Sequence, residues 1–173
     1  MKLITFPYNR RLAVEYAHRW AYGRNPEYFD FQGIGGDCTN FASQCIYAGA
    51  GIMNYTPVYG WYYITANART ASWTGVQYLY NFLTSNQDTG PYATETDISA
   101  MEPGDVCQLA LDRNEFHHTP VIVEVGDVPT LDNILIAAHS RDADYRPLSS
   151  YRFRAVRFLH IEGVRTRVPD ENA

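Results

Sequence analysis

The sequence has one lysine, three cysteines and no long hydrophobic run, and each shortage excludes a class of protein. Nearly all of the positive charge is arginine, it forms no dense tract, and the formal net charge is −5. This pattern argues against nucleic acid and against an anionic membrane surface as partners, and it favours neutral or cationic substrates. No segment is long enough to span a membrane, and the N-terminus lacks the apolar core of a signal peptide. We expect no membrane association. Oligomeric state and localisation stay open, since the chain is either cytoplasmic or exported as part of a longer or processed parent.

The cysteines are too few and too irregularly spaced for a disulfide framework or a structural zinc site. They stand at positions 38, 45 and 107, an odd number without a Cys-x-x-Cys pair. The histidines at positions 117, 118 and 139 offer no clear third and fourth metal ligand at helical or strand spacing. We therefore expect no metal, no cofactor and thiols that stay reduced.

The 173 residues suit a single α+β domain, 1–173, in which N-terminal helices pack on a C-terminal antiparallel sheet. Apolar residues at three-to-four-residue spacing predict helices over about 9–22, 39–48 and 73–85. The pattern then becomes strand-like, which predicts strands at 106–109, 119–125, 134–139 and 151–161. Short turns, including 141–147, join these strands into a meander. The core should span about 8–161, with a loose tail at 162–173.

A segment rich in aromatic residues, from Tyr55 to Ser72, has no clear periodicity and predicts an irregular loop. We expect this loop to lie beside the functional site, where Trp61 and Tyr62 would contact the substrate. The same aromatic surface suits recognition of a glycan or a peptide. A non-catalytic binding module is therefore the alternative function.

Cys38 is the strongest candidate for chemistry. The run Gly35-Gly36-Asp37-Cys38 joins a glycine-rich loop to an apolar helical segment, so Cys38 stands where a helix begins. The free amide groups and the dipole at a helix start stabilise an anion, which predicts a thiolate nucleophile. The neighbouring residues are polar, and Asp37 among them is a candidate substrate contact. Cys45 follows two turns later on the same helix face and is predicted to pack in the core.

Gln32 lies six residues before Cys38, the interval at which papain-type enzymes carry an oxyanion-hole glutamine. In such a site a neutral histidine takes the thiol proton, the thiolate attacks a carbonyl, and the imidazolium returns a proton to the leaving amine. Backbone N–H groups at the helix start would hold the oxyanion together with Gln32. Hydrolysis and transfer to an amine, as in transglutaminase-like enzymes, share the acyl-enzyme, so the sequence leaves that choice open.

The base must come from the histidines at positions 18, 117, 118, 139 and 160. His117 and His118 open a strand, where adjacent side chains point to opposite faces, so only one of them can meet Cys38. Strand spacing alone does not choose between them. His139 closes the next strand and is placed to orient the base through a hydrogen bond. The rivals for this orienting role are Asp142 and Asp144.

Several short motifs along the chain belong together. They are Tyr8-Asn9-Arg10, Asn25-Pro26, the run from Gly36 to Gln44, Trp61-Tyr62-Tyr63, Ser72-Trp73 and Pro103-Gly104-Asp105-Val106. This set resembles the bacterial putative amidase-domain family over about residues 8–161, and that family is similar to papain-like cell-wall cysteine hydrolases. The resemblance implies Cys38 as nucleophile, His118 as base because Thr119 follows it, and His139 as orienter because Ser140 follows it. It also implies a papain-like fold that hydrolyses amide bonds in peptidoglycan stem peptides or other peptide-like substrates.

Overall fold

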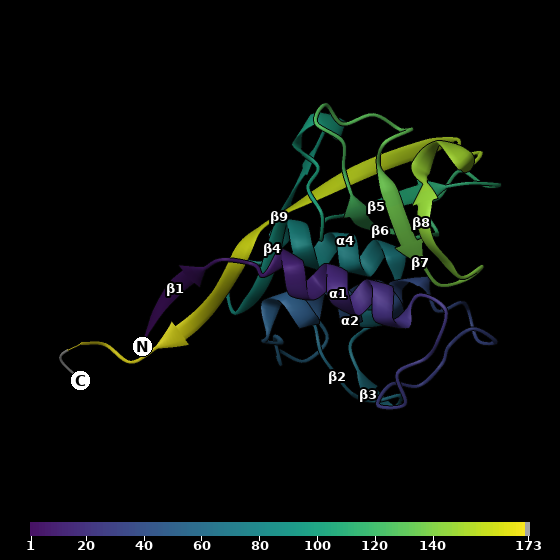
Figure 1. The fold of residues 1–173 in the computed structure, drawn as a ribbon. Coiled ribbons are helices and arrows are strands. Elements are labelled where there is room, and N and C mark those ends of the chain that lie inside the picture. The colour runs from purple at the N-terminus through teal and green to yellow at the C-terminus, as the bar shows by residue number, and fades with distance from the viewer. Residues whose placement is uncertain (172–173) are drawn as a thin grey trace.

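The computed structural model describes residues 1–171 as a mixed α+β fold with one large antiparallel sheet and few helices (Figure 1). The helices are α1 (Arg10–Trp20), α2 (Cys38–Ala50), α3 (Ala71–Thr74) and α4 (Val76–Ser85). The strands are β1 (Lys2–Phe6), β2 (Tyr63–Thr65), β3 (Ala68–Arg69), β4 (Gly90–Thr96), β5 (Val106–Ala110), β6 (Val121–Glu124), β7 (Leu135–Ala138), β8 (Ala143–Pro147) and β9 (Ala155–Val168). None of the described helices combines the length and the apolar character needed to cross a membrane.

Strand β9 is the centre of the seven-stranded sheet, whose hydrogen-bonded order is β1-β9-β5-β6-β7-β8. Its 14 residues pair with β5 near the beginning and with β1 near the end, while β4 pairs with it along the other edge. Strands β5 to β8 form an antiparallel meander. Figure 1 shows β1 and the end of β9 extending together from the rest of the fold, beside both chain termini. The predicted meander is therefore confirmed for its first three strands, and β9 ties it to the N-terminus.

The helices begin and end where local chemistry favours it. The Asn9 side chain accepts a hydrogen bond from the Leu12 N–H and caps α1. Gly51 ends α2 in a left-handed conformation, with φ of 71°, that glycine adopts without strain. The helix predicted after Ser72 is divided at Gly75 into α3 and α4. Helix α2 packs against α1 and α3 and is buried along most of its length, so it is a fixed support for Cys38 at its start.

Apolar side chains cover both faces of the sheet in the meander. Val106, Val121 and Ala137 belong to the larger core, which includes the helices. Their strand neighbours Cys107, Ile122 and Ile136 belong to a second core on the other face. Because both faces are buried, these strands appear in the sequence as nearly continuous apolar runs.

The structure differs from the prediction at four of the strands in the large sheet. Strand β1 precedes α1, so the helices do not all come first, and β4 follows α4. Strand β8 occupies 143–147, where a turn is predicted, because these residues pair with β7. The tail predicted at 162–173 is wrong for residues 162–168, which form the end of β9 and pair with β1 and β4. Residues 172–173 of that predicted tail lie outside the described residues.

Candidate functional site

Cys38 is the first residue of α2, and its thiol is nearly buried, with 7% of the residue exposed. Its Sγ lies 3.7 Å from Thr39 Oγ1 and 3.9 Å from the carbonyl oxygen of His117. Burial raises the pKa of the Cys38 thiol, and the Thr39 hydroxyl and the backbone N–H groups of Thr119 and Thr39 offset only part of this rise. The predicted thiolate is therefore corrected to a neutral thiol in the resting site, because burial outweighs the stabilisation expected at a helix start.

Two hydroxyl groups attach the start of α2 to the segment that carries the paired histidines. Thr39 Oγ1 and Thr119 Oγ1 are 3.0 Å apart, and both side chains are buried. Gln108 Nε2 donates to the same Thr119 hydroxyl at 3.3 Å. Thr39 follows Cys38 and Thr119 follows His118, so this contact sets the position of the thiol relative to the histidine segment.

His118 is buried, with 5% of the residue exposed, and its Nε2 lies 3.4 Å from the Tyr151 hydroxyl. Burial lowers the pKa of His118 to about 4, and the positive charges of His117 and Arg146 act in the same direction. The ring is thus neutral at pH 7 and is able to accept a proton. Within residues 1–171 the Cys38 thiol has no hydrogen bond to this ring, since its contacts are those to Thr39 and the His117 carbonyl.

His117 and His118 have different surroundings, as expected for neighbours in an extended chain. His117 is half-buried, with Nδ1 3.1 Å from the Glu115 carbonyl oxygen and Nε2 3.2 Å from Asp112 Oδ1. His118 instead contacts Tyr151, whose pKa is raised by burial and, to a smaller extent, by the Cys38 thiol nearby. Both residues line the same cleft, and His118 is the one whose ring contacts Tyr151.

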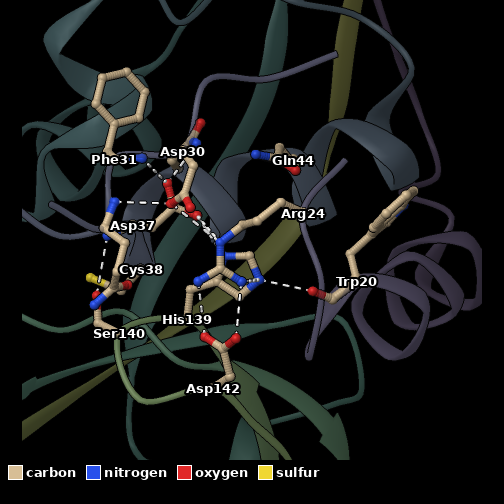
Figure 2. Close-up of polar contacts among 12 residues, drawn as sticks. Trp20, Arg24, Asp30, Phe31, Asp37, Cys38, Gln44, His139, Ser140 and Asp142 are labelled. Carbon is tan, nitrogen blue, oxygen red and sulfur yellow. Dashed lines mark hydrogen bonds and ion pairs between the residues drawn. The ribbon is translucent and has the colours of Figure 1, made fainter. Parts of the chain in front are cut away.

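His139 follows β7 and contacts the residue that precedes Cys38. Its Nδ1 lies 2.5 Å from Asp37 Oδ2, its Nε2 lies 2.8 Å from the Trp20 carbonyl oxygen, and only 1% of the residue is exposed (Figure 2). Nδ1 therefore faces the Asp37 carboxylate, while Nε2 faces both the Trp20 carbonyl and, at 3.2 Å, the donor Nη1 of Arg24. Neither nitrogen bonds to His118, so the structure does not contain the orienting contact predicted for His139.

Asp37 is the centre of a buried polar cluster at the start of α2 (Figure 2). Its carboxylate accepts hydrogen bonds from His139, from the Phe31 N–H at 2.8 Å and from the Asn40 side chain at 2.9 Å, while its own N–H donates to Ser140 Oγ at 3.1 Å. Burial acts to raise the pKa of Asp37, but the hydrogen bonds from these three donors outweigh it and hold the pKa below its ordinary value. The predicted substrate contact is wrong for Asp37, because its carboxylate is 1% exposed and fully used inside the fold.

Arg24 covers this cluster with a set of ion pairs (Figure 2). Its guanidinium makes two hydrogen bonds to Asp142, at 3.0 and 3.1 Å. Its Nε lies 3.2 Å from Asp30 and 3.7 Å from Asp37. The cluster is thus a network of charges that joins α2 to the turn after β7.

The two aspartates that rival His139 as orienters are also used elsewhere. Asp142 pairs with Arg24, and Asp144 lies 2.8 Å from Nδ1 of His18. Neither carboxylate has a hydrogen bond to His118 in the part of the chain that the structure describes. The side chain that contacts the His118 ring is instead Tyr151, through its hydroxyl.

A cleft of about 710 Å³ opens beside His118. Gln32 and Gly35 line it from the loop before α2, Ser140 lines it from the turn after β7, and Tyr151 lines it from the segment before β9. Gln32 is exposed, so the structure places its side chain at the same cleft as His118. Ser140, which lines the cleft, accepts a hydrogen bond through Oγ from the N–H of Asp37, the residue before Cys38. The first-turn N–H groups of α2 therefore begin close to the cleft.

The predicted aromatic contacts lie outside the cleft. Trp61 is fully buried, its indole N–H donates to Ser43 Oγ at 3.1 Å, and its ring packs 4.7 Å from that of Trp73. The prediction that Trp61 touches the substrate is therefore wrong, because an aromatic of this size stabilises the core. Tyr62 packs near Tyr55, at 5.8 Å between ring centroids, and does not line the cleft of His118. Within the aromatic segment Trp61 and Tyr63 are buried, whereas Tyr55 and Tyr59 are exposed.

Nothing in the sequence marks Tyr151, which is one of 14 tyrosines and lies 33 residues after His118. The same holds for Arg146, whose charge acts on both of these residues. The hydroxyl contact between Thr39 and Thr119 does have a sequence signal, since a threonine follows both the candidate nucleophile and the candidate base.

The fold and cleft thus define an α+β protein with a thiol, a neutral imidazole and a buried His–Asp pair at the start of one helix. The chain matches the putative amidase domain family over residues 7–161, and it belongs to that family. Membership indicates hydrolysis of C–N amide bonds as the general activity. The chain is also 30% identical over 151 residues to the uncharacterized protein YhbB of Bacillus subtilis (strain 168). That alignment covers 84% of this chain and 47% of YhbB, so the chain spans about half the length of this relative. No solved structure matches the chain.

Proposed function

We propose that the protein is a cysteine amidohydrolase or peptidase in which Cys38 is the nucleophile and His118 is the general base. The observation that carries this proposal is the position of Cys38 Sγ, 3.9 Å from the carbonyl oxygen of His117 and therefore against the His117–His118 backbone. The Thr39–Thr119 contact supports it by holding the two segments together one residue further on. Membership of the putative amidase domain family supports amide bonds as the target.

The reaction starts from a neutral thiol and a neutral imidazole, as the directions of the two pKa shifts favour. His118 accepts the thiol proton while Sγ attacks the amide carbonyl carbon, and Cys38 N–H with the Gln32 side chain holds the oxyanion. The C–N bond breaks as the imidazolium gives its proton to the amine, leaving a thioester on Cys38. His118 then removes a proton from water, the hydroxide attacks the thioester, and the carboxylic acid leaves while the thiol recovers its proton.

The other polar groups act on position in this mechanism. The Tyr151 hydroxyl holds His118 through Nε2, which leaves Nδ1 as the nitrogen that accepts the thiol proton in this proposal. The Asp37–His139 pair fixes the residue before the nucleophile and does not exchange protons with the substrate. A nucleophile at a helix start, packed against an antiparallel sheet that supplies histidine, supports a papain-like arrangement. Peptide-like amides, including peptidoglycan stem peptides, are the proposed substrates.

Alkylation with iodoacetamide tests this proposal without knowledge of the substrate. The three cysteines are all buried and free, but Cys38 keeps 7% exposure and its Sγ lies 3.9 Å from the carbonyl oxygen of His117, which lines the cleft. Cys45 and Cys107 are 0% exposed and serve as internal controls. We expect mass mapping of the native protein near pH 7 to find the modification on Cys38. The variant His118→Gln should slow it about tenfold or more, since the base that assists thiol ionisation is lost.

His117→Gln is the matched control, because it removes the neighbouring ring from a half-buried position. Its alkylation rate should stay within about twofold of the native rate. The proposal fails if Cys38 is as protected as Cys45, or if both histidine variants react like the native protein. Mass spectrometry after incubation with peptide and cell-wall fragments then identifies substrates through a thioacyl adduct on Cys38.

A further inference from the structure

The cleft beside His118 carries positive charge, although the chain as a whole has a formal charge of −5. Its lining includes four arginines and one acidic residue, namely Arg113, Arg141, Arg146, Arg152 and Asp112. Arg113 lies 3.4 Å from Asp112 and 3.7 Å from Glu115, which compensate its charge. Within residues 1–171 the other three arginines have no carboxylate partner. The local charge therefore argues against the neutral or cationic substrates that the net charge favours.

Arg146, in β8, is held firmly beside the candidate base. Its Nε donates to Ser150 Oγ at 2.8 Å, and its Cζ lies 3.6 Å from the ring centroid of Tyr151. These contacts fix the half-buried guanidinium but supply no negative charge. Tyr151 in turn contacts His118, and the positive charge of Arg146 contributes to the lowered pKa of that histidine. A cation is thus fixed one side chain away from the base.

Arg141 reaches the same cleft from the turn between β7 and β8. Ser140 and Arg141 both have left-handed backbone conformations, with φ of 62° and 74°. Such conformations are unfavourable for residues with a side chain and persist where the surrounding structure holds them. Here the N–H of Asp37 donates to Ser140 Oγ, which anchors the turn next to the nucleophile and keeps Arg141 at the cleft.

We infer that the arginines lining the cleft bind a carboxylate of the substrate, so that the preferred substrates are amides with a carboxylate close to the bond that is cleaved. Guanidinium groups bind carboxylates through paired, charge-assisted N–H···O hydrogen bonds, and a fixed guanidinium loses little freedom on doing so. This inference rests on the proposed function, because it takes the cleft beside Cys38 and His118 as the substrate site.

Two alkylating reagents test the inference. Iodoacetate and iodoacetamide both react by displacement of iodide by Cys38 Sγ, but only iodoacetate carries a carboxylate. The measured quantity is the ratio of the two rates at Cys38 in the native protein, divided by the same ratio in guanidinium-denatured protein. We expect this normalised ratio to be about five, because one contact between opposite unit charges in water changes a rate by about that factor. The ratio should fall as salt is added, since salt screens the charges.

Arginine variants assign the effect to the proposed subsite. Arg146→Gln should bring the ratio close to one, while Arg146→Lys should retain most of the preference. The exposed Arg141→Gln and Arg152→Gln should each reduce it, and these variants serve if Arg146→Gln does not fold. Arg11→Gln removes an equal charge from the exposed surface of α1, where Arg11 pairs with Glu15, and should leave the ratio unchanged.

The outcomes separate the two proposals. A preference for iodoacetate that survives all three glutamine variants in the cleft would come from a source other than these arginines and would overturn the arginine subsite. A native ratio of one, with Cys38 still reactive and dependent on His118, would overturn the subsite while leaving the proposed function intact. If neither reagent modifies native Cys38, the cysteine mechanism fails and the subsite inference fails with it.

Discussion

His118 lies just before β6 and His139 just after β7, and both are almost fully buried, yet their surroundings are opposite. His118 contacts a tyrosine hydroxyl and has positive charges nearby, and its pKa is lowered to about 4. His139 lies between the Asp37 carboxylate and the Trp20 carbonyl. One ring is kept neutral at the edge of a cleft, and the other is used up in a buried polar cluster. The comparison teaches that the partners of a histidine, rather than its place at a strand end, decide whether it is available for proton transfer.

The largest effect on the free energy of unfolding should come from removing Asp37, the carboxylate that holds His139. Asp37→Ala leaves His139, the Phe31 N–H and the Asn40 side chain without their shared acceptor, so we expect a loss of about 3–5 kcal/mol in the free energy of unfolding. Urea unfolding followed by circular dichroism measures it. The matched variant His118→Gln should cost about 1 kcal/mol or less, because the ring has a single hydrogen-bond partner 3.4 Å away.

An equal loss of stability for Asp37→Ala and His118→Gln would contradict the division of roles. The same would follow if Asp37→Ala unfolded within about 1 kcal/mol of the native protein, since a buried acceptor with three donors cannot then be structural.

The residues around the candidate nucleophile could be predicted from the sequence, whereas most of the hydrogen-bond network around them could not. Cys38 and Gln32 belong to one local loop-to-helix motif, so short-range patterns suffice to bring them together. Tyr151 and Arg24 meet their histidines only after the sheet has formed, which local spacing does not reveal. The fold divides in the same way. The caps of α1 and α2 are local, whereas β1 requires β9, with Lys2 opposite Val168.

The His118 site and the Asp37–His139 site should also change the free energy of unfolding over different ranges of pH. The pKa of His118 falls from 6.5 to about 4 on folding, so the unfolded chain binds more protons between these values. Stability should therefore decrease by roughly 3 kcal/mol as the pH is lowered from 6.5 to 4. The folded pKa of Asp37 lies below 3.8, so the stability that Asp37 contributes is present above that value and is lost as the pH falls through the folded pKa.

Urea unfolding curves at a series of pH values test this separation. His118→Gln should flatten the loss between about pH 6.5 and 4, and Asp37→Asn should leave that loss in place while changing the behaviour below about pH 4. If His118→Gln kept the full slope above pH 4, other groups would be responsible, and the neutral state assigned to His118 would lose its support.

The smallest effect should come from the hydroxyl contact that joins the two segments of the site. Thr119→Val keeps the shape of the side chain but leaves the Thr39 hydroxyl and Gln108 Nε2 without this partner, so we expect a loss of about 1–3 kcal/mol in unfolding free energy. The exposed Thr94→Val, in β4, is the control and should change it by less than about 0.5 kcal/mol. If the contact also aligns Cys38 with His118, alkylation of Cys38 should slow in Thr119→Val and not in Thr94→Val. A destabilised Thr119→Val with native alkylation kinetics would show that the contact serves folding alone, and that Tyr151 is sufficient to place the base.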